Sequence, residues 1–327
     1  MRNPIFDIMK GIAIVSMIVG HCFLPDILRK CIFIWHMPLF FFISGYFFKP
    51  VNNVITVLRK NTRSLILPYI VTCLFYLFLI LTKDFILDDV DFYNSLVGCL
   101  VGSAVSDNSF HFFSEYSVGA TWFLLALFWT RTFYNYIRIR FTGKVIILIC
   151  IMLSVIAIKI ENNLFYIPTN VLQGISALPF YCAGNVFREN LLFDKFYFKV
   201  KFVFIAFIFF LLSLFWGGLE IALCKFECYP LDIIGGISGI YLIYCISKYV
   251  SQQRILAYKI AYIGRISILV LCVHAIESRF PIYNKIDSIF DSTFYDFLII
   301  SLRCAVDVLS AICLVRFNLI KRFFNIR

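Results

Sequence analysis

The 327 residues of this chain are 61% hydrophobic, 19% aromatic and only 15% charged, and their mean hydropathy is +0.89. A soluble domain of this length cannot bury so much apolar surface, so the composition excludes a soluble protein and indicates an integral membrane protein. The net charge of +11 follows from the placement of basic residues at the ends of membrane spans, and no nucleic-acid partner is expected.

Apolar stretches of membrane-spanning length predict about ten transmembrane helices, and no strand-like alternation competes with them. The predicted spans are residues 8–27, 31–48, 64–83, 118–136, 145–160, 168–187, 202–221, 232–250, 260–276 and 296–315. Most lysines and arginines fall on the side of the two termini, which the positive-inside rule therefore places in the cytoplasm. We predict an all-α, polytopic bundle in the cytoplasmic (inner) membrane, with residues 1–327 forming one domain and no separate soluble domain.

The first predicted span contains two ionisable side chains, Lys10 and His21. At about 100° per residue, eleven steps turn a helix by roughly three full turns, so the two side chains share one face and lie about 16 Å apart along the axis. Asp7 lies on nearly the same face. Turning these groups toward lipid would be costly, so the face is expected to border a protein interior or a polar cavity.

The second predicted span runs back inward and carries His36 near its outer end. A tight connection makes the first two spans antiparallel neighbours, so His36 and His21 are expected at similar depth. Pro38 removes a backbone donor and frees a carbonyl one turn earlier, near Ile34, which favours an opened helix beside a polar site. Further along, Gly45 permits close approach of another helix.

Residues 84–117 form a long segment that is predicted to face outside and contains His111. Its apolar stretch, Ser95–Gly102, is too short to span a membrane and is predicted to be re-entrant or interfacial. No partner for His111 is evident in the sequence. Any chemistry must then occur within the bundle or at its faces, because loops of this size cannot form a soluble catalytic domain.

The twelve cysteines predict no metal site, since most lie within spans, where a thiol behaves as a small apolar group. Cys224 and Cys228 share a short external loop, and the sequence leaves open whether they form a disulfide. In the last span, Arg303 and Asp307 are four residues apart and are expected to neutralise one another as a structural pair. A role of this pair in proton relay is the alternative.

Five sequence blocks stand out along nearly the whole chain. The blocks are Asp7-x-x-Lys10-Gly11-Ile12 with Gly20-His21, His36-Met37-Pro38-Leu39-Phe40-Phe41-Phe42-Ile43-Ser44-Gly45-Tyr46, Thr121-Trp122-Phe123-Leu124, Leu178-Pro179-Phe180-Tyr181, and Ile263-Gly264-Arg265-Ile266-Ser267 leading to His274. Together, and in this order, they resemble the acyltransferase-three family of membrane acyltransferases, in particular its fucose 4-O-acetylase-like subgroup.

The resemblance implies a bundle of about ten helices that transfers an acyl group, usually acetyl from acetyl-coenzyme A, to a sugar hydroxyl of a surface polysaccharide or lipid-linked glycan. The coenzyme is then a co-substrate, and no tightly bound cofactor is expected. The family's basic-x10-His motif falls on Lys10 and His21. Many members carry arginine at the first position, whereas a lysine is a point charge without the planar guanidinium fork.

Acyl transfer to an alcohol needs a base whose pKa lies near neutrality, and histidine is the side chain with that property. We therefore expect His21 to be the general base. His36 is a candidate for orienting the acceptor or donating to the developing oxyanion, and so is Trp122. His274 makes an ordinary interfacial contact or, as the family pattern implies, helps to bind the substrate.

Lys10, Arg265 and Arg188 lie at predicted cytoplasmic span ends and are candidates for binding the phosphates of the coenzyme. Arg131 lies at such an end too, and for Arg131 and Arg188 the favoured interpretation is an anchor at the membrane surface. A transporter or exporter of a glycan precursor or small organic acid is the alternative function for this many helices with buried ionisable groups. Inverted repeats with paired broken helices would favour transport, and the sequence shows none.

Overall fold

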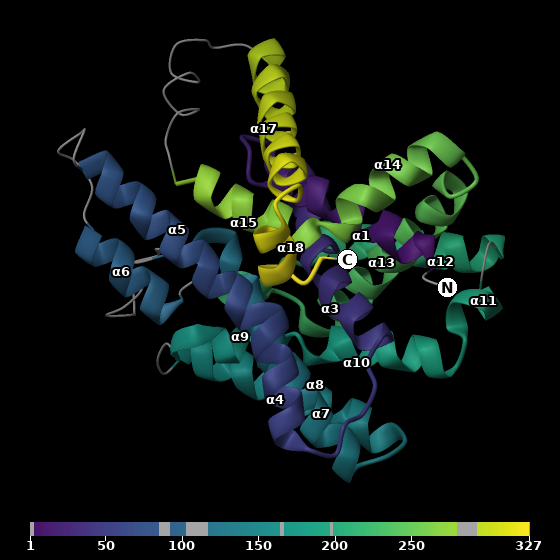
Figure 1. Ribbon diagram of the computed structural model, residues 1–327. Coiled ribbons are helices and arrows are strands. Elements are labelled where there is room, and N and C mark those ends of the chain that lie inside the picture. Colours follow the sequence, from purple (N-terminus) through teal and green to yellow (C-terminus); the bar gives the residue numbers. More distant parts are fainter. Residues whose placement is uncertain are drawn as a thin grey trace.

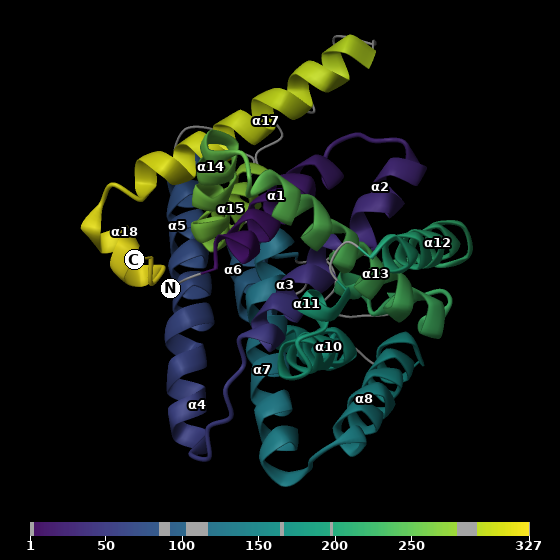
Figure 2. The same ribbon diagram turned by 90° about the vertical axis from the view of Figure 1, so that its right-hand side faces the viewer.

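The computed structural model describes residues 3–84, 92–102, 117–163, 167–196, 199–279 and 293–326. Within these ranges the protein is a bundle of helices with one small hairpin (Figures 1 and 2), which confirms the predicted all-α class. The first half contains α1 (Pro4–Gly20), α2 (Asp26–Phe33), α3 (His36–Tyr46), α4 (Val54–Asn61), the π-helical turn η1 (Thr62–Ile66), α5 (Leu67–Asp84), α6 (Phe92–Val101), η2 (Gly119–Thr121), α7 (Trp122–Arg140) and α8 (Lys144–Asn163). The second half contains η3 (Pro168–Asn170), α9 (Val171–Ser176), α10 (Leu178–Glu189), α11 (Leu192–Phe196), α12 (Val200–Trp216), β1 (Leu219–Glu220), η4 (Ile221–Leu223), β2 (Lys225–Phe226), α13 (Tyr229–Val250), α14 (Arg254–Arg265), α15 (Ser267–Glu277), α17 (Thr293–Leu314) and α18 (Asn318–Phe323).

Four helical stretches of the described chain are long and apolar enough to cross a membrane, and the bent pair α14–α15 makes a fifth if it counts as one span. The four are Asp26–Tyr46, Val54–Thr82, Tyr229–Val250 and Phe297–Leu314. All five coincide with predicted spans. The other predicted spans fall on α1, α7, α8, α9 with α10, and α12, which are helical but lie outside this set. The total of ten spans, the cytoplasmic termini and the single domain therefore stay predictions.

The second predicted span is broken where the sequence indicated. The helix is interrupted at Ile34 and Trp35, so that α3 begins at His36. Pro38 follows within the first turn of α3, where its missing N–H is tolerated. The break places His36 at a helix start instead of mid-helix.

Two pairs of helices touch through glycines that leave room for the partner's backbone. A side-chain carbon at Gly45 would collide with the carbonyl oxygen of Tyr181, and one at Gly184 with that of Phe42, which joins α3 to α10. The close approach predicted for Gly45 is thereby confirmed.

The second glycine contact joins α1 to α14, two helices far apart in the sequence. A side-chain carbon at Gly11 would collide with the carbonyl oxygen of Ile260, and one at Gly264 with that of Asp7. The chain then bends by 66° between α14 and α15. This bend directs α15 along the far half of α1.

A two-stranded hairpin interrupts the helical fold between α12 and α13. Leu219 pairs with Phe226 and Glu220 with Lys225 in antiparallel register. The fully buried carboxylate of Asp232 stabilises the two ends of this hairpin. It accepts hydrogen bonds from the backbone N–H groups of Gly218 and Cys228, each at 2.9 Å. The sequence pattern, read for helices alone, did not predict this hairpin.

Two predictions for loops and cysteines can be compared with this fold. All twelve thiols, each within the described ranges, are free, so Cys224 and Cys228 form no disulfide here. The apolar stretch Ser95–Gly102 lies largely in α6, a ten-residue helix. His111 and most of the external segment around it lie outside the described residues.

Candidate active site

Three of the four histidines border one cavity of about 420 Å³, called the histidine cavity below. His21 is the C-cap of α1, His36 is the first residue of α3, and His274 lies on α15. All three helices start, end or bend beside the cavity. The hairpin geometry of the first two spans predicts that His21 and His36 lie close together, and both border this cavity.

The first two imidazoles have different surroundings. His21 is exposed because it faces the cavity, and its ring centroid lies 5.8 Å from that of Phe33 and 5.5 Å from that of His274. His36 is buried, and its Nδ1 lies 2.9 Å from the carbonyl oxygen of Ile32. A carbonyl oxygen only accepts, so Nδ1 of His36 carries the hydrogen and, in the neutral ring, Nε2 is an acceptor.

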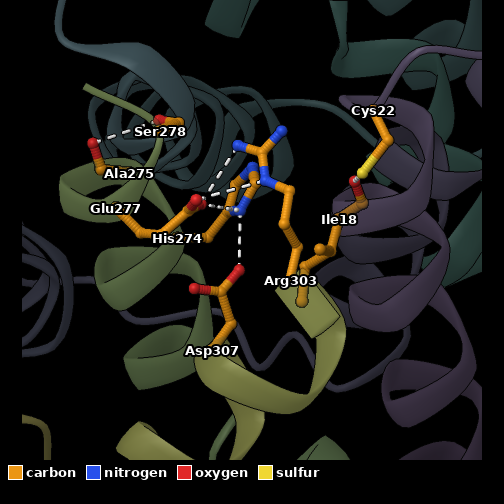
Figure 3. A network of polar contacts seen from close by, with 8 residues as sticks. All are labelled: Ile18, Cys22, His274, Ala275, Glu277, Ser278, Arg303 and Asp307. Carbon is orange, nitrogen blue, oxygen red and sulfur yellow. Dashed lines mark hydrogen bonds and ion pairs between the residues drawn. The ribbon is translucent and has the colours of Figure 1, made fainter. Parts of the chain in front are cut away.

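The third imidazole belongs to a network of charged groups between α15 and α17 (Figure 3). Nδ1 of His274 lies 2.8 Å from a carboxylate oxygen of Asp307 and 3.5 Å from one of Glu277. The guanidinium of Arg303 donates to both oxygens of Glu277, at 3.2 and 3.1 Å. The predicted pairing of Arg303 with Asp307 is therefore corrected: each binds a residue of α15, because the bend at Ile266 brings that helix against α17.

His274, Glu277 and Asp307 also have the atom types of a metal site, and their ligand atoms lie within 4.8 Å of one another. Arg303 already occupies both oxygens of Glu277 and places a fixed positive charge beside the cluster. A second cation would be repelled there, and Glu277 would have to give up two charge-assisted hydrogen bonds to bind it. In this structure the contacts of the cluster are those of an ion-pair network.

Trp122 and the hairpin complete the walls of the histidine cavity. Trp122 begins α7 directly after the η2 turn and is nearly buried against the cavity. On the hairpin side, Glu220 lies 3.8 Å from the guanidinium of Arg29, which sits 5.0 Å from the ring centroid of Phe33. The opening therefore carries a carboxylate, a guanidinium cation and an aromatic ring.

A second cavity of about 330 Å³, called the basic cavity below, is bordered by Lys10, Lys49, Lys60 and Arg131. None of its described lining residues is an aspartate or glutamate. Asp7 lies just behind, 2.8 Å from the ammonium of Lys10. Four cations around one cavity create a positive potential that attracts anions.

Arg131 is the most constrained of these cations. Its Nε donates to Ser44 on α3 at 2.8 Å, and its guanidinium also donates to Ser64 in η1 at 3.3 Å. The two serines hold the guanidinium between three elements without neutralising its charge. An anchor at the membrane surface would need no such fixation.

The linings of the two cavities adjoin on α3 and α7, at a group of aromatic rings. On α3, Met37 borders the histidine cavity and Phe40, one turn later, borders the basic cavity. On α7, the adjacent residues Trp122 and Phe123 are divided in the same way. The ring of Phe123 lies 5.6 Å from that of Phe40 and 5.1 Å from that of Phe41, and these three rings are called the aromatic septum below.

A family model described as an acyltransferase domain, that of the acyltransferase-three family, matches residues 3–315. The chain belongs to this family. Searches for similar curated proteins and for similar solved structures each found no match. The protein is thus a membrane acyltransferase with several apolar helices suited to multi-pass insertion. The match does not distinguish the fucose 4-O-acetylase-like subgroup.

Several blocks that carry the resemblance lie where the helices of this acyltransferase touch. The block around Gly11 and the block around Gly264 form the contact between α1 and α14. The block containing Gly45 and the block ending at Tyr181 form the contact between α3 and α10. These contacts hold together helices that carry lining residues of the two cavities.

Two predicted coenzyme-binding residues are not among the residues that border the basic cavity. Arg265 is exposed at the end of α14, beside the rings of Tyr258 and Tyr262. Arg188 donates to the carbonyl oxygen of Phe48 at 2.9 Å and so supports the wall of the cavity from behind.

The sequence did not predict the other cations of the basic cavity as binding residues. Lys49 and Lys60 look like ordinary surface charges at span ends, and Arg131 like a membrane anchor. One signal was available, because Arg131 follows Leu127 by four residues and Phe123 by eight, which places all three on one side of α7. What that side faces depends on α3 and η1, and this is a tertiary property.

Proposed function

We propose that this acyltransferase transfers an acetyl group from acetyl-coenzyme A, admitted from the cytoplasm, to a sugar hydroxyl of a surface polysaccharide or lipid-linked glycan. One observation carries the proposal. The helix α1 presents Lys10 to the basic cavity and His21 to the histidine cavity, so a cation and an imidazole border adjoining spaces on one rigid element.

The basic cavity suits the donor because coenzyme A carries several phosphate groups. Lys10 and Arg131 would bind phosphate within the cavity, and Lys49 and Lys60 would attract the coenzyme at its mouth. The lack of lining carboxylates among the described residues favours an anion over a neutral or cationic ligand. The about 16 Å of helix rise between Lys10 and His21 would be crossed by the extended arm of the coenzyme, which must pass the aromatic septum.

The histidine cavity suits the chemical step. His21 would accept the hydroxyl proton as the acceptor oxygen attacks the thioester carbonyl carbon. The carbon–sulfur bond then breaks, and the departing thiolate takes up the proton, so that an ester and free coenzyme A are formed. Nδ1–H of His36 donates to the Ile32 carbonyl oxygen, so its Nε2 would accept a hydrogen bond from a hydroxyl group of the sugar. The indole N–H of Trp122 is then the better donor to the oxyanion.

The outer wall of the histidine cavity suits a carbohydrate. Arg29 and Glu220 offer charged hydrogen-bonding groups at the opening, and Phe33 and Trp122 offer aromatic faces. Sugars present alternating hydroxyl groups and apolar C–H patches, and these are the complementary groups. The polar opening away from the basic cavity favours an acceptor that arrives from the other side of the membrane.

The test is transfer by the purified protein in lipid nanodiscs. Acetyl-coenzyme A with a labelled acetyl group is supplied, and label is measured in base-labile esters of a membrane glycan fraction. We expect transfer by the wild-type protein and a loss of about 10²-fold or more in His21→Ala, the range for removal of a general base. Phe23→Ala is the control, because Phe23 is 83% exposed, two residues away and not part of the cavity lining.

Two results would contradict the proposal. Wild-type levels of transfer in His21→Ala would remove His21 as the base. A wild-type protein that neither binds nor cleaves acetyl-coenzyme A, but moves a glycan precursor or organic acid across the membrane of a vesicle, would instead establish transport.

A further inference from the structure

The His274–Asp307 pair is a feature of the histidine cavity that the proposed step does not use. His274 borders the cavity and is 1% exposed, and Asp307 stands directly behind it with no exposed surface. Their contact of 2.8 Å joins α15 to α17, and the His274 ring centroid lies 5.5 Å from that of His21 on α1. Three helices therefore converge on two neighbouring imidazoles (Figure 3 shows the His274 side).

Asp307 is the group that orients His274. A carboxylate accepts hydrogen bonds, so Nδ1 of His274 carries the hydrogen, and Nε2 of the neutral ring keeps its lone pair. Glu277 is farther from Nδ1, at 3.5 Å, and both of its oxygens are bound by Arg303. The Arg303–Glu277 pair thus leaves Asp307 as the partner of the imidazole.

The burial of Asp307 shows that this placement is specific. Its second carboxylate oxygen is buried and accepts no hydrogen bond within the described part of the protein. A buried carboxylate with an unused oxygen is costly for stability alone, since a smaller or apolar residue would avoid that desolvation. Buried polar groups that lack a hydrogen-bond partner are typical of catalytic and binding sites.

We infer that Asp307 is a positioning residue that holds His274 in the Nδ1–H tautomer, and that His274 with Asp307 is a second proton-accepting group of the acyltransferase, which takes a proton from His21 as His21 accepts the hydroxyl proton. The inference rests on the proposed function. In the reaction, the hydroxyl proton moves to an imidazole nitrogen as the C–O bond forms, and it leaves with the thiolate as the C–S bond breaks. One nitrogen of His21 accepts the hydroxyl proton while the N–H on its other nitrogen passes a proton to Nε2 of His274, and Asp307 stabilises the positive charge that His274 gains; the same path in reverse returns the proton to the thiolate.

The first experiment is a double-mutant cycle of Asp307→Asn and His274→Ala, with turnover and the KM for acetyl-coenzyme A measured in nanodiscs. An asparagine keeps the size of the side chain but can donate to Nδ1 and so select the wrong tautomer. We expect Asp307→Asn to lower kcat by at least about tenfold with the donor KM unchanged, and to have no further effect in the His274→Ala background.

Asp232→Asn is the matched control, since Asp232 is equally buried but binds backbone N–H groups of the hairpin. Its effect on turnover should be the same in both backgrounds, as for any residue that acts only through stability. Full turnover in Asp307→Asn, or equal losses from that change with and without His274, would overturn the inference.

A second measurement needs no variant of Asp307. The ¹⁵N-histidine spectrum of the wild-type protein, assigned with His274→Gln, should show a protonated Nδ1 and an unprotonated Nε2 for His274. The opposite tautomer would refute the positioning role even if Asp307→Asn failed to fold. Failure of the proposed function is recognised separately, because the wild-type protein would then transfer no label.

Discussion

Lys10 lies on α1 and His21 is the C-cap of the same helix, yet they border two different cavities. The aromatic septum, formed by Phe40, Phe41 and Phe123, lies where the linings of those cavities adjoin. In the transfer proposed above, such a partition would keep the charged donor apart from the sugar acceptor. The relationship between Lys10 and His21 therefore defines which residues should affect donor binding and which should affect the chemical step.

Replacing the cations of the basic cavity should weaken donor binding more than chemistry. We expect Lys10→Met and Arg131→Met each to raise the KM for acetyl-coenzyme A by about tenfold, the loss of one charge-assisted contact to a phosphate. The kcat should change much less, because neither side chain reaches the histidine cavity. Steady-state kinetics of the purified variants gives both values.

Lys201→Met is the control for that prediction, because Lys201 is an exposed cation on α12 that does not border the basic cavity. Its donor KM should equal that of the wild type. A fall in kcat with an unchanged KM in Lys10→Met would show that Lys10 does not bind the donor.

Opening the aromatic septum should uncouple thioester cleavage from transfer. Phe123 is almost fully buried and borders the basic cavity, and its neighbour Trp122 borders the histidine cavity, so Phe123→Ala should open a path between them. Water could then reach the thioester, so the ratio of hydrolysed to transferred acetyl groups should rise several-fold. The truncation should also destabilise the fold by about 3–5 kcal/mol, as usual for a buried phenylalanine.

Phe133→Ala serves as the comparison, since Phe133 lies on the same helix but stacks on Trp129 outside both cavities. It should leave the ratio of hydrolysis to transfer unchanged. An unchanged ratio in Phe123→Ala would mean that the septum does not control access to the thioester.

Gly45→Ala should loosen the contact between α3 and α10. The added carbon would collide with the carbonyl oxygen of Tyr181, which belongs to a rigid helix and cannot move aside by itself. We expect a loss of about 1–3 kcal/mol in unfolding free energy, the range for overpacking, seen as a lower Tm in detergent.

Gly20→Ala gives the reference for this substitution, because a carbon there would meet only the side chains of Phe33 and Ile32. Its Tm should fall less than that of Gly45→Ala. Equal Tm values for Gly45→Ala and the wild type would show that the two helices are farther apart than described.

Arg303→Gln should destabilise the protein by leaving Glu277 without its two charge-assisted hydrogen bonds. Removal of one member of a buried ion pair costs about 3–5 kcal/mol, and both of these side chains are only 12% exposed. The double variant Arg303→Gln/Glu277→Gln should recover much of that loss, because it leaves no unpaired charge. Thermal unfolding of the wild-type protein and the two variants measures the effect, and a double variant less stable than Arg303→Gln would disprove the pairing.

Much of the bundle was predictable because membrane insertion acts on local sequence. The break at Ile34 and Trp35 follows from Pro38, and the contact at Gly45 follows from a missing side chain, so both were found without any partner in view. The placement of His21 and His36 beside one cavity followed from the rise of a helix and a short connection. These features depend on covalent structure and on neighbours close in the chain.

Other features depended on residues far apart in the sequence. Arg303 and Asp307 are one turn apart on α17, and their spacing suggested a pair. The 66° bend before α15 instead brought Glu277 and His274 to them. Spacing on one helix shows which side chains share a face, and it cannot show what another helix places against that face.

For this protein, the sequence by itself determined the apolar helices, the broken second span and the ionisable residues of the first span. It also carried the resemblance to the acyltransferase-three family. Only the tertiary structure decided that Lys10 and His21 border separate cavities, that Arg131 lies in one of them, and that Asp307 stands behind His274. The physical reason is how far apart in the chain the interacting residues are. Helix formation and insertion are set by contiguous residues, whereas a cavity and its charges are set by helices packed from distant parts of the chain.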